Sequence, residues 1–129
     1  MDHILLPSTI EFQDTDNPKV GKLVLSPCHQ GYGTTLGNAL RRVLLSSIPG
    51  AAVEAVKIEG VDHEFSAVPG VLEDAVQVIL NLKQLAVKLH SDGPVKLALK
   101  KKGLGDVTAA DFETNADVEI INKDLKIAT

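Results

Sequence analysis

The sequence lacks several features that specialised classes of protein need. It has no tryptophan, one tyrosine and three phenylalanines in 129 residues, too few aromatic rings for a surface that stacks unpaired bases. A single cysteine, Cys28, excludes an intramolecular disulfide. No apolar run approaches the roughly 18 to 20 residues of a membrane span, and the N-terminus has no export pattern. We therefore expect a cytoplasmic protein with an aliphatic core and no membrane segment.

Positive charge is also in short supply. Lys and Arg number 13 against 17 Asp and Glu, which gives a formal net charge of -4. A protein whose main task is to neutralise phosphates needs the opposite balance. We expect no direct nucleic-acid binding by this sequence, and the charge favours protein partners. Because 44% of the residues are hydrophobic and 23% charged, the composition is that of an ordinary globular domain, with room for two lobes.

The order of expected elements predicts an α+β fold. In the first half, β-rich or alternating runs are each followed by a segment in which apolar residues recur at helical spacing. The expected elements there are at most a leading strand in residues 1–18, a strand at Val20–Ser26, a helix at Thr34–Ile48, a strand at Val53–Glu59 and a helix at Val71–Ala86.

After the second helix only strands are expected. Alternating apolar and polar residues on either side of Asp92-Gly93 predict a hairpin of Val87–Leu89 with Val95–Leu99. Two further strands are expected at Asp117–Ile121 and Leu125–Ala128, and pairing in this half should be mostly antiparallel. Because the sequence stops directly after a strand, we expect it to be a truncated piece of a longer protein. An unpaired terminal strand would be an exposed edge.

Both helices carry side chains that a simple surface helix would not place where they fall. On a helical wheel, Arg41, Arg42 and Leu45 lie opposite the apolar face of the first helix. An apolar side chain beside arginines is typical of a docking face, but a helix between two layers, or one exposed leucine, gives the same pattern. Lys83 falls on the apolar arc of the second helix. It either extends to solvent at the last turn or meets a partner's carboxylate.

The glycines before the first helix raise a function of another class. A strand, a turn at Gly31 and Gly33 and a following helix would suit a small phosphate- or nucleotide-binding enzyme. The dinucleotide fingerprint requires its third glycine where this sequence has Leu36, and Gly37 comes one residue late. A structural turn is therefore the favoured interpretation, and saturable nucleotide binding would be the test of the alternative.

Other chemistry is weakly signalled. The four histidines are scattered, and Cys28-His29 has no second pair at zinc-ligand spacing, so no metal or cofactor is expected. Glu73 and Asp74 point about 100° apart on a helix, which suits a helix N-terminus better than an acid–base pair. Five lysines form a basic stripe that is typical of a solvated strand face: Lys88, Lys96, Lys100, Lys101 and Lys102.

Three runs of the sequence share their order and spacing with a known family. They are TLGNALRRVLLSS, HEFS with the following GVLEDAVQVILNLK, and GDVTAAD at Gly105–Asp111. With them, the segment Gly31–Leu89 closely resembles the amino-terminal domain of the bacterial RNA polymerase alpha subunit, and the resemblance extends from about Lys19 to the end of the sequence. It implies two lobes: residues 1–52 as the first half of a dimerisation lobe, and residues 53–129 as most of an inserted, mostly antiparallel β lobe.

The resemblance also implies roles for the unusual helix residues. Arg41, Arg42 and Leu45 would dock the large beta subunit, and Lys83 would make another large-subunit contact. The positions that would face a second alpha subunit or the core are Tyr32, Thr35, Leu36, Leu40 and Val43. Such a chain is a non-catalytic assembly scaffold that dimerises and binds beta and beta-prime, and it takes part in nucleotidyl transfer only as a polymerase subunit. A stand-alone interaction module with the same fold is a further possibility.

Overall fold

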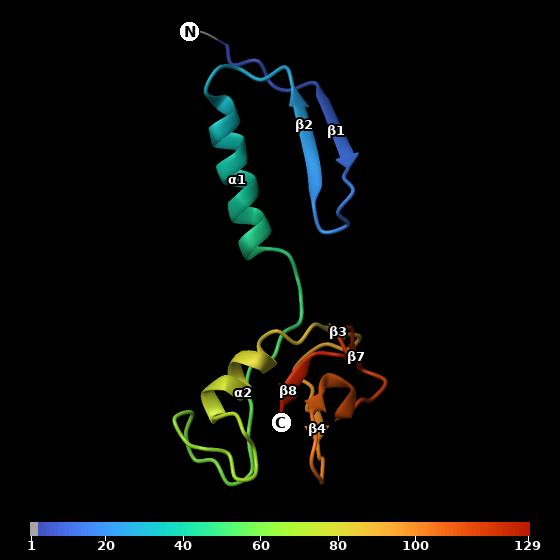
Figure 1. Cartoon of the computed structure of the whole chain (residues 1–129). Helices are drawn as coiled ribbons and strands as arrows, with labels where there is room; N and C mark the ends of the chain where they lie inside the picture. The colour runs from blue at the N-terminus through green and yellow to red at the C-terminus, as the bar shows by residue number, and fades with distance from the viewer. Residues whose placement is uncertain (1–2) are drawn as a thin grey trace. The chain divides into compact units, whose positions relative to one another are not determined.

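A computed structural model describes residues 3–129 of the protein (Figure 1). The chain divides into two compact units, Met1–Ile48 and Pro49–Thr129. The lobe boundary expected after residue 52 falls shortly beyond this division, and residues 1–2 of the expected first lobe lie outside the described part. Within residues 3–129, neither helix is long and apolar enough to cross a lipid bilayer.

The first unit consists of a hairpin and one helix. Strands β1 (Thr9–Asp14) and β2 (Gly21–Ser26) are antiparallel, so β1 is the leading strand expected within residues 1–18. Helix α1 (Tyr32–Ser46) begins and ends slightly before the predicted bounds. It starts after Gly31, whose φ of 80° lies in the left-handed region that favours glycine.

The second unit combines one α-helix with three small antiparallel sheets, in which β3 pairs with β7, β4 with β6, and β5 with β8. The predicted α+β class and antiparallel second half are therefore confirmed. Its elements are α2 (Ala75–Leu82), β3 (Val87–Leu89), β4 (Ala98–Leu99), β5 (Val107–Thr108), the 3-10 helix η1 (Ala109–Asp111), β6 (Phe112–Glu113), β7 (Val118–Ile120) and β8 (Lys126–Ala128).

The hairpin predicted around Asp92-Gly93 is wrong. β3 pairs with β7, which places Val87 opposite Ile120, and β4 pairs with β6. Ile120 is 2% exposed, so the long-range pairing brings a deeply buried side chain next to β3, which the local turn could not do. Burial of apolar surface outweighs a short-range turn signal here.

One other strand prediction also needs correction. The alternating run Val53–Glu59 is irregular backbone, and its Val53 and Ile58 pack as partly buried loop residues against the core. The burial does not follow the alternation, since Val56 is 43% exposed, so alternation in the sequence alone does not establish a strand. The last strand is present as predicted: β8 pairs with β5 in a two-stranded sheet, and its Ile127 and Ala128 are buried.

Helix α2 is shorter than the predicted Val71–Ala86 because specific residues end it. Asp74 is the N-cap, and its carboxylate accepts a hydrogen bond of 2.8 Å from the backbone N–H of Gln77. At the other end, Lys83 is the C-cap, and the backbone N–H of Gln84 donates to the carbonyl of Asn81. The helix therefore has a defined start and stop that place Lys83 at its end.

The core of the second unit has two neighbouring apolar clusters, and Phe112 and Leu125 pack against both. Asn81 also ties α2 to β8, since its side-chain amide donates to the carbonyl of Ile127 at 2.9 Å. The buried members are Val78, Leu82, Ile127 and Ala128 in one cluster, and Leu85, Ala109 and Ile120 in the other.

Candidate docking surfaces

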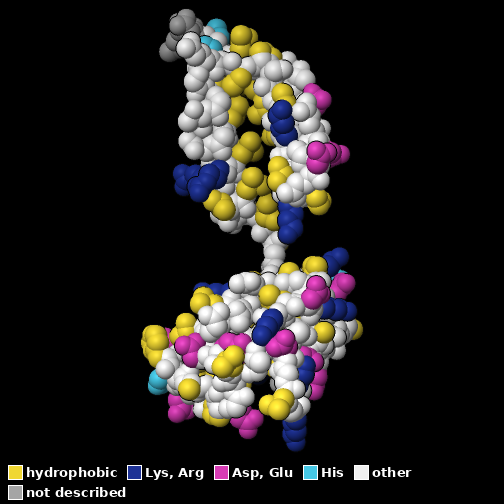
Figure 2. Space-filling view, in the orientation of Figure 1, with side chains coloured by type: hydrophobic (Ala, Val, Ile, Leu, Met, Phe, Trp, Pro, Cys, Tyr) yellow, Lys and Arg dark blue, Asp and Glu magenta, His cyan; other side chains and the backbone are white. Residues whose placement is uncertain are grey.

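One side of α1 presents two arginines and a leucine to solvent. Arg41 and Arg42 are exposed, and Leu45 is 71% exposed. Within residues 3–129 neither guanidinium takes part in an ion pair. Figure 2 shows dark blue basic side chains at the outer edge of α1. Exposed guanidinium groups beside an apolar side chain can bind a partner's carboxylates while the leucine is buried.

The apolar side of α1 is only partly covered. Tyr32 and Leu36 are half-buried, whereas Leu40 and Val43 are 43% and 56% exposed and Thr35 is exposed as well. No residue of α1 is buried. The hairpin contributes further open apolar surface, because Ile10 and Phe12 of β1 are 66% and 81% exposed. Exposed large apolar side chains on both α1 and β1 are candidates for contact with another surface.

Lys83 belongs to the second unit. As the C-cap of α2 it is exposed, so its ammonium group reaches solvent at the end of the apolar arc instead of lying within it. Leu80, one turn earlier, is 47% exposed. The lysine is therefore accessible to a partner's carboxylate, and its position also suits the helix dipole.

Glu73, expected at the helix N-terminus, instead holds the last described residue of the chain. Its carboxylate accepts hydrogen bonds from the backbone N–H of Thr129 at 2.7 Å and from the hydroxyl of Thr129 at 3.0 Å. These bonds, the backbone one first, hold the pKa of Glu73 below its ordinary value. Nothing local in the sequence signals a contact between residues so far apart.

Two aspartates of the second unit, Asp106 and Asp111, form a further set of polar contacts. Asp111 accepts from Lys101 Nζ at 2.7 Å and from the backbone N–H of Thr108 at 2.8 Å, and the lysine is the main cause of its lowered pKa. Asp106 pairs with Lys126 at 2.9 Å, which lowers the pKa of Asp106 in the same way. Lys101 is thus engaged within its own chain, unlike the solvated lysine that the stripe predicted.

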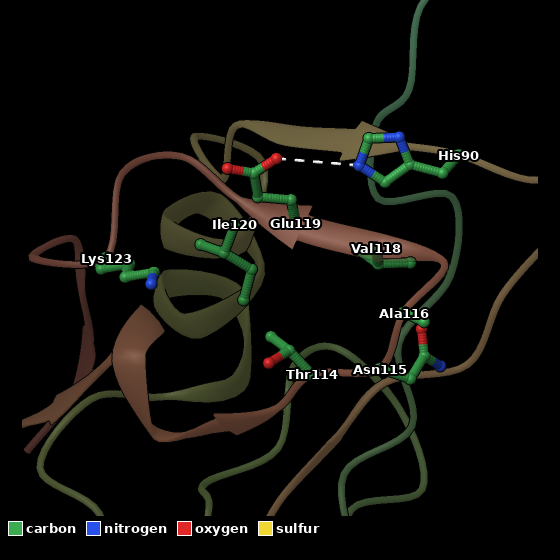
Figure 3. Close-up of a pocket in the computed structure, with 8 residues that line it drawn as sticks. All are labelled: His90, Thr114, Asn115, Ala116, Val118, Glu119, Ile120 and Lys123. Atoms are coloured by element: carbon green, nitrogen blue, oxygen red, sulfur yellow. Dashed lines mark ion pairs between the residues drawn. The ribbon is translucent and has the colours of Figure 1, made fainter.

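The structure gives the nucleotide-binding alternative no support. Gly31 serves as the N-cap of α1. A Cβ placed on Gly31 or on Gly37 would have no atom within 4 Å, so no close packing within the chain requires a glycine at either position. The two pockets described, of about 210 and 420 Å³, are both in the second unit. Figure 3 shows the smaller one, where His90 and Glu119 approach to 3.7 Å. Within residues 3–129 no three His, Cys, Asp or Glu side chains are grouped to hold a metal ion.

Comparison with known proteins points to one family. The sequence profile described as the RNA polymerase Rpb3/RpoA insert domain matches residues 56–129. The DNA-directed RNA polymerase subunit alpha of Symbiobacterium thermophilum is 62% identical over 109 residues, which cover 84% of this chain and 35% of that protein.

Other relatives carry the same name. The subunit alpha of Desulfitobacterium hafniense strain DCB-2 is 60% identical over 115 residues, 89% of this chain and 36% of the relative. That of Alkaliphilus metalliredigens is 51% identical over 123 residues, 95% of this chain and 39% of the relative. The chain thus spans little more than a third of the length of these relatives. With the profile match over most of the second unit, these likenesses show that the chain belongs to the RNA polymerase Rpb3/RpoA insert domain family.

Proposed function

We propose that this chain acts as a non-catalytic assembly scaffold of bacterial RNA polymerase, which pairs with a second alpha subunit and docks the beta and beta-prime subunits. The relatives' common name, DNA-directed RNA polymerase subunit alpha, supports a role for this chain in that polymerase complex. In this proposal residues 1–52 belong to the dimerisation lobe and residues 53–129 to the inserted lobe. The chain supplies no catalytic group, and it serves nucleotidyl transfer only through the enzyme that it helps to assemble.

The observation that carries the proposal is the exposure of both sides of α1. Arg41, Arg42 and Leu45 are open on one side, where a large subunit would bind. Leu40 and Val43 are open on the apolar side, where a second copy would cover them. A helix that served only its own unit would bury one of these sides. Tyr32, Thr35 and Leu36 extend the proposed dimer surface, and Lys83 is the proposed second contact with a large subunit.

Replacing Arg42→Ala tests the docking side. If the guanidinium is desolvated against a carboxylate of the beta subunit, its loss should weaken capture of isolated beta subunit by about 2–5 kcal/mol. Isothermal titration calorimetry would measure the change, and circular dichroism would show that the variant folds. Lys22→Ala, which removes an exposed cation from β2 of the same unit, is the matched control. Unchanged capture by a folded Arg42→Ala variant would contradict the docking role.

A further inference from the structure

The loop between β4 and β5, residues 100–106, carries an unusual apex. Leu104 is fully exposed, with 107% of its reference surface area accessible. It stands between Gly103 and Gly105, whose φ angles of 100° and 139° are strained for residues with a side chain. The two glycines therefore give the backbone a shape that projects one leucine away from the body of the unit.

The base of this loop is closed by a lysine. Lys101 Nζ donates to the backbone carbonyl of Asp106 at 2.6 Å and to the carboxylate of Asp111 at 2.7 Å. The Asp106 carboxylate is held in turn by Lys126 at 2.9 Å. These contacts join both ends of the loop to β8 and η1, elements that pack in the core. A preformed loop loses less conformational entropy on binding than a free one.

Two free cations precede the apex in the loop. Lys100 and Lys102 are exposed, and within residues 3–129 neither takes part in an ion pair. Lys96, two residues before β4, is exposed as well. Of the lysines in the basic stripe, Lys101 is therefore held by contacts at the base of the loop, whereas Lys100 and Lys102 are free to meet a partner. An exposed apolar side chain in the same short loop as free ammonium groups is complementary to an apolar pocket with an acidic rim.

We propose that the Leu104 loop, residues 100–106, is a docking element that inserts Leu104 into an apolar pocket rimmed by Asp and Glu carboxylates on a partner protein. This inference rests on the proposed function, since that partner is one of the large polymerase subunits. A lipid surface fits less well, because residues 100–106 contain no second large apolar side chain and membrane binding needs a broader apolar face. The loop contains none of the residues already proposed for docking, Arg41, Arg42, Leu45 and Lys83.

Site-specific photocrosslinking in the reconstituted complex tests the proposal. A variant chain with benzoylphenylalanine in place of Leu104 is assembled with the beta and beta-prime subunits of the same organism. A second variant, with the same crosslinker in place of Leu45, reports on the proposed function. We expect a crosslink from position 104 to a large-subunit peptide containing carboxylates. Lys100→Glu with Lys102→Glu should lower its yield about tenfold, the loss typical of a contributing interface group, and added salt should lower it too.

Unmodified variants complete the design. Leu104→Ser should weaken capture of the same large subunit about tenfold, whereas Ile121→Ser, an exposed apolar residue with uncharged immediate neighbours, should leave it unchanged. A crosslink from position 45 without one from position 104, or a yield insensitive to the charge reversals, overturns this inference alone. Binding to phosphatidylserine vesicles that depends on Leu104, without a large-subunit crosslink, also overturns it. Failure at both positions overturns the proposed function with it.

Discussion

Both units of this chain contain an amphipathic helix, but the second unit buries its apolar residues and the first leaves them exposed. In the second unit, Pro49–Thr129, helix α2 buries Ala75, Val78 and Leu82, and the last two pack in one cluster with Ile127 and Ala128 of β8. In the first, Met1–Ile48, helix α1 buries nothing, and no described residue of that unit is buried. Most of the exposed large apolar side chains lie there as well. The hairpin and α1 together have too few elements to enclose a core.

The difference shows that an amphipathic pattern predicts an apolar helix face, while the burial of that face depends on whether another element packs on it. The second unit finds its cover within the chain, because β8 returns across α2 and Glu73 fixes Thr129. Within residues 3–48, α1 has a comparable apolar stripe whose Leu40, Val43 and Leu44 stay exposed. The contrast agrees with the proposed partner surface on α1, and four experiments can break or sharpen it.

Leucine truncation in each unit should give the largest contrast. Leu82→Ala removes a side chain that is 6% exposed, so it should cost about 2–5 kcal/mol of unfolding free energy through lost burial and a cavity. Leu44→Ala in α1, where the side chain is 59% exposed, should cost less than about 0.5 kcal/mol. Urea unfolding followed by circular dichroism at low concentration measures both. Equal costs would show that α1 is covered after all.

Self-association should depend on the first unit. We expect the chain to associate at high concentration, and Leu40→Gln with Leu44→Gln to weaken that association at least about tenfold, since each leucine fully buried contributes roughly 1.5–3 kcal/mol. Sedimentation velocity over a concentration series is the measurement. The control is Leu72→Gln with Leu80→Gln, which alters exposed leucines of the second unit. A chain that stays monomeric at high concentration would refute this prediction.

The two helix starts differ on a smaller scale. Asp74→Ala should destabilise α2 by about 1 kcal/mol, because it removes the side-chain cap on Gln77. Asp74→Asn retains an acceptor and should cost less. Helix α1 has no side-chain cap bond to lose at Gly31. Hydrogen exchange at the α2 amides would measure the effect, and exchange in Asp74→Ala as slow as in the unmodified chain would show that the cap contributes nothing.

Acid should weaken the second unit modestly. The folded-state pKa values of Glu73, Asp106 and Asp111 are lowered by their hydrogen bonds and lysine partners. The unfolded chain therefore binds more protons in acid, so the stability from these groups is present above the ordinary carboxyl range and is lost below about pH 4. Urea unfolding between neutral and acid pH measures it. Glu73→Gln should make the dependence shallower, and an unchanged slope would assign the effect to other groups.

The sequence was a good guide where short-range rules apply. Pro27 and the β-rich run before it place the end of β2, and the spacing of Leu36, Leu40 and Val43 places α1. The docking roles of Arg41, Arg42 and Leu45 remain predictions, which the exposure of these residues supports. Short-range rules failed around Asp92-Gly93, where a good turn signal lost to the pairing of β3 with β7.

Local composition alone determined the α+β class, the positions of both helices and the aliphatic character of the core, because propensity and periodicity act over a few residues. Tertiary structure decided which strands pair, which lysine of the basic stripe is engaged and which carboxylate holds Thr129. It also decided that α2 is covered and α1 is open. These outcomes depend on contacts between residues distant in the chain, whose free energy is set by the surface each finds opposite it.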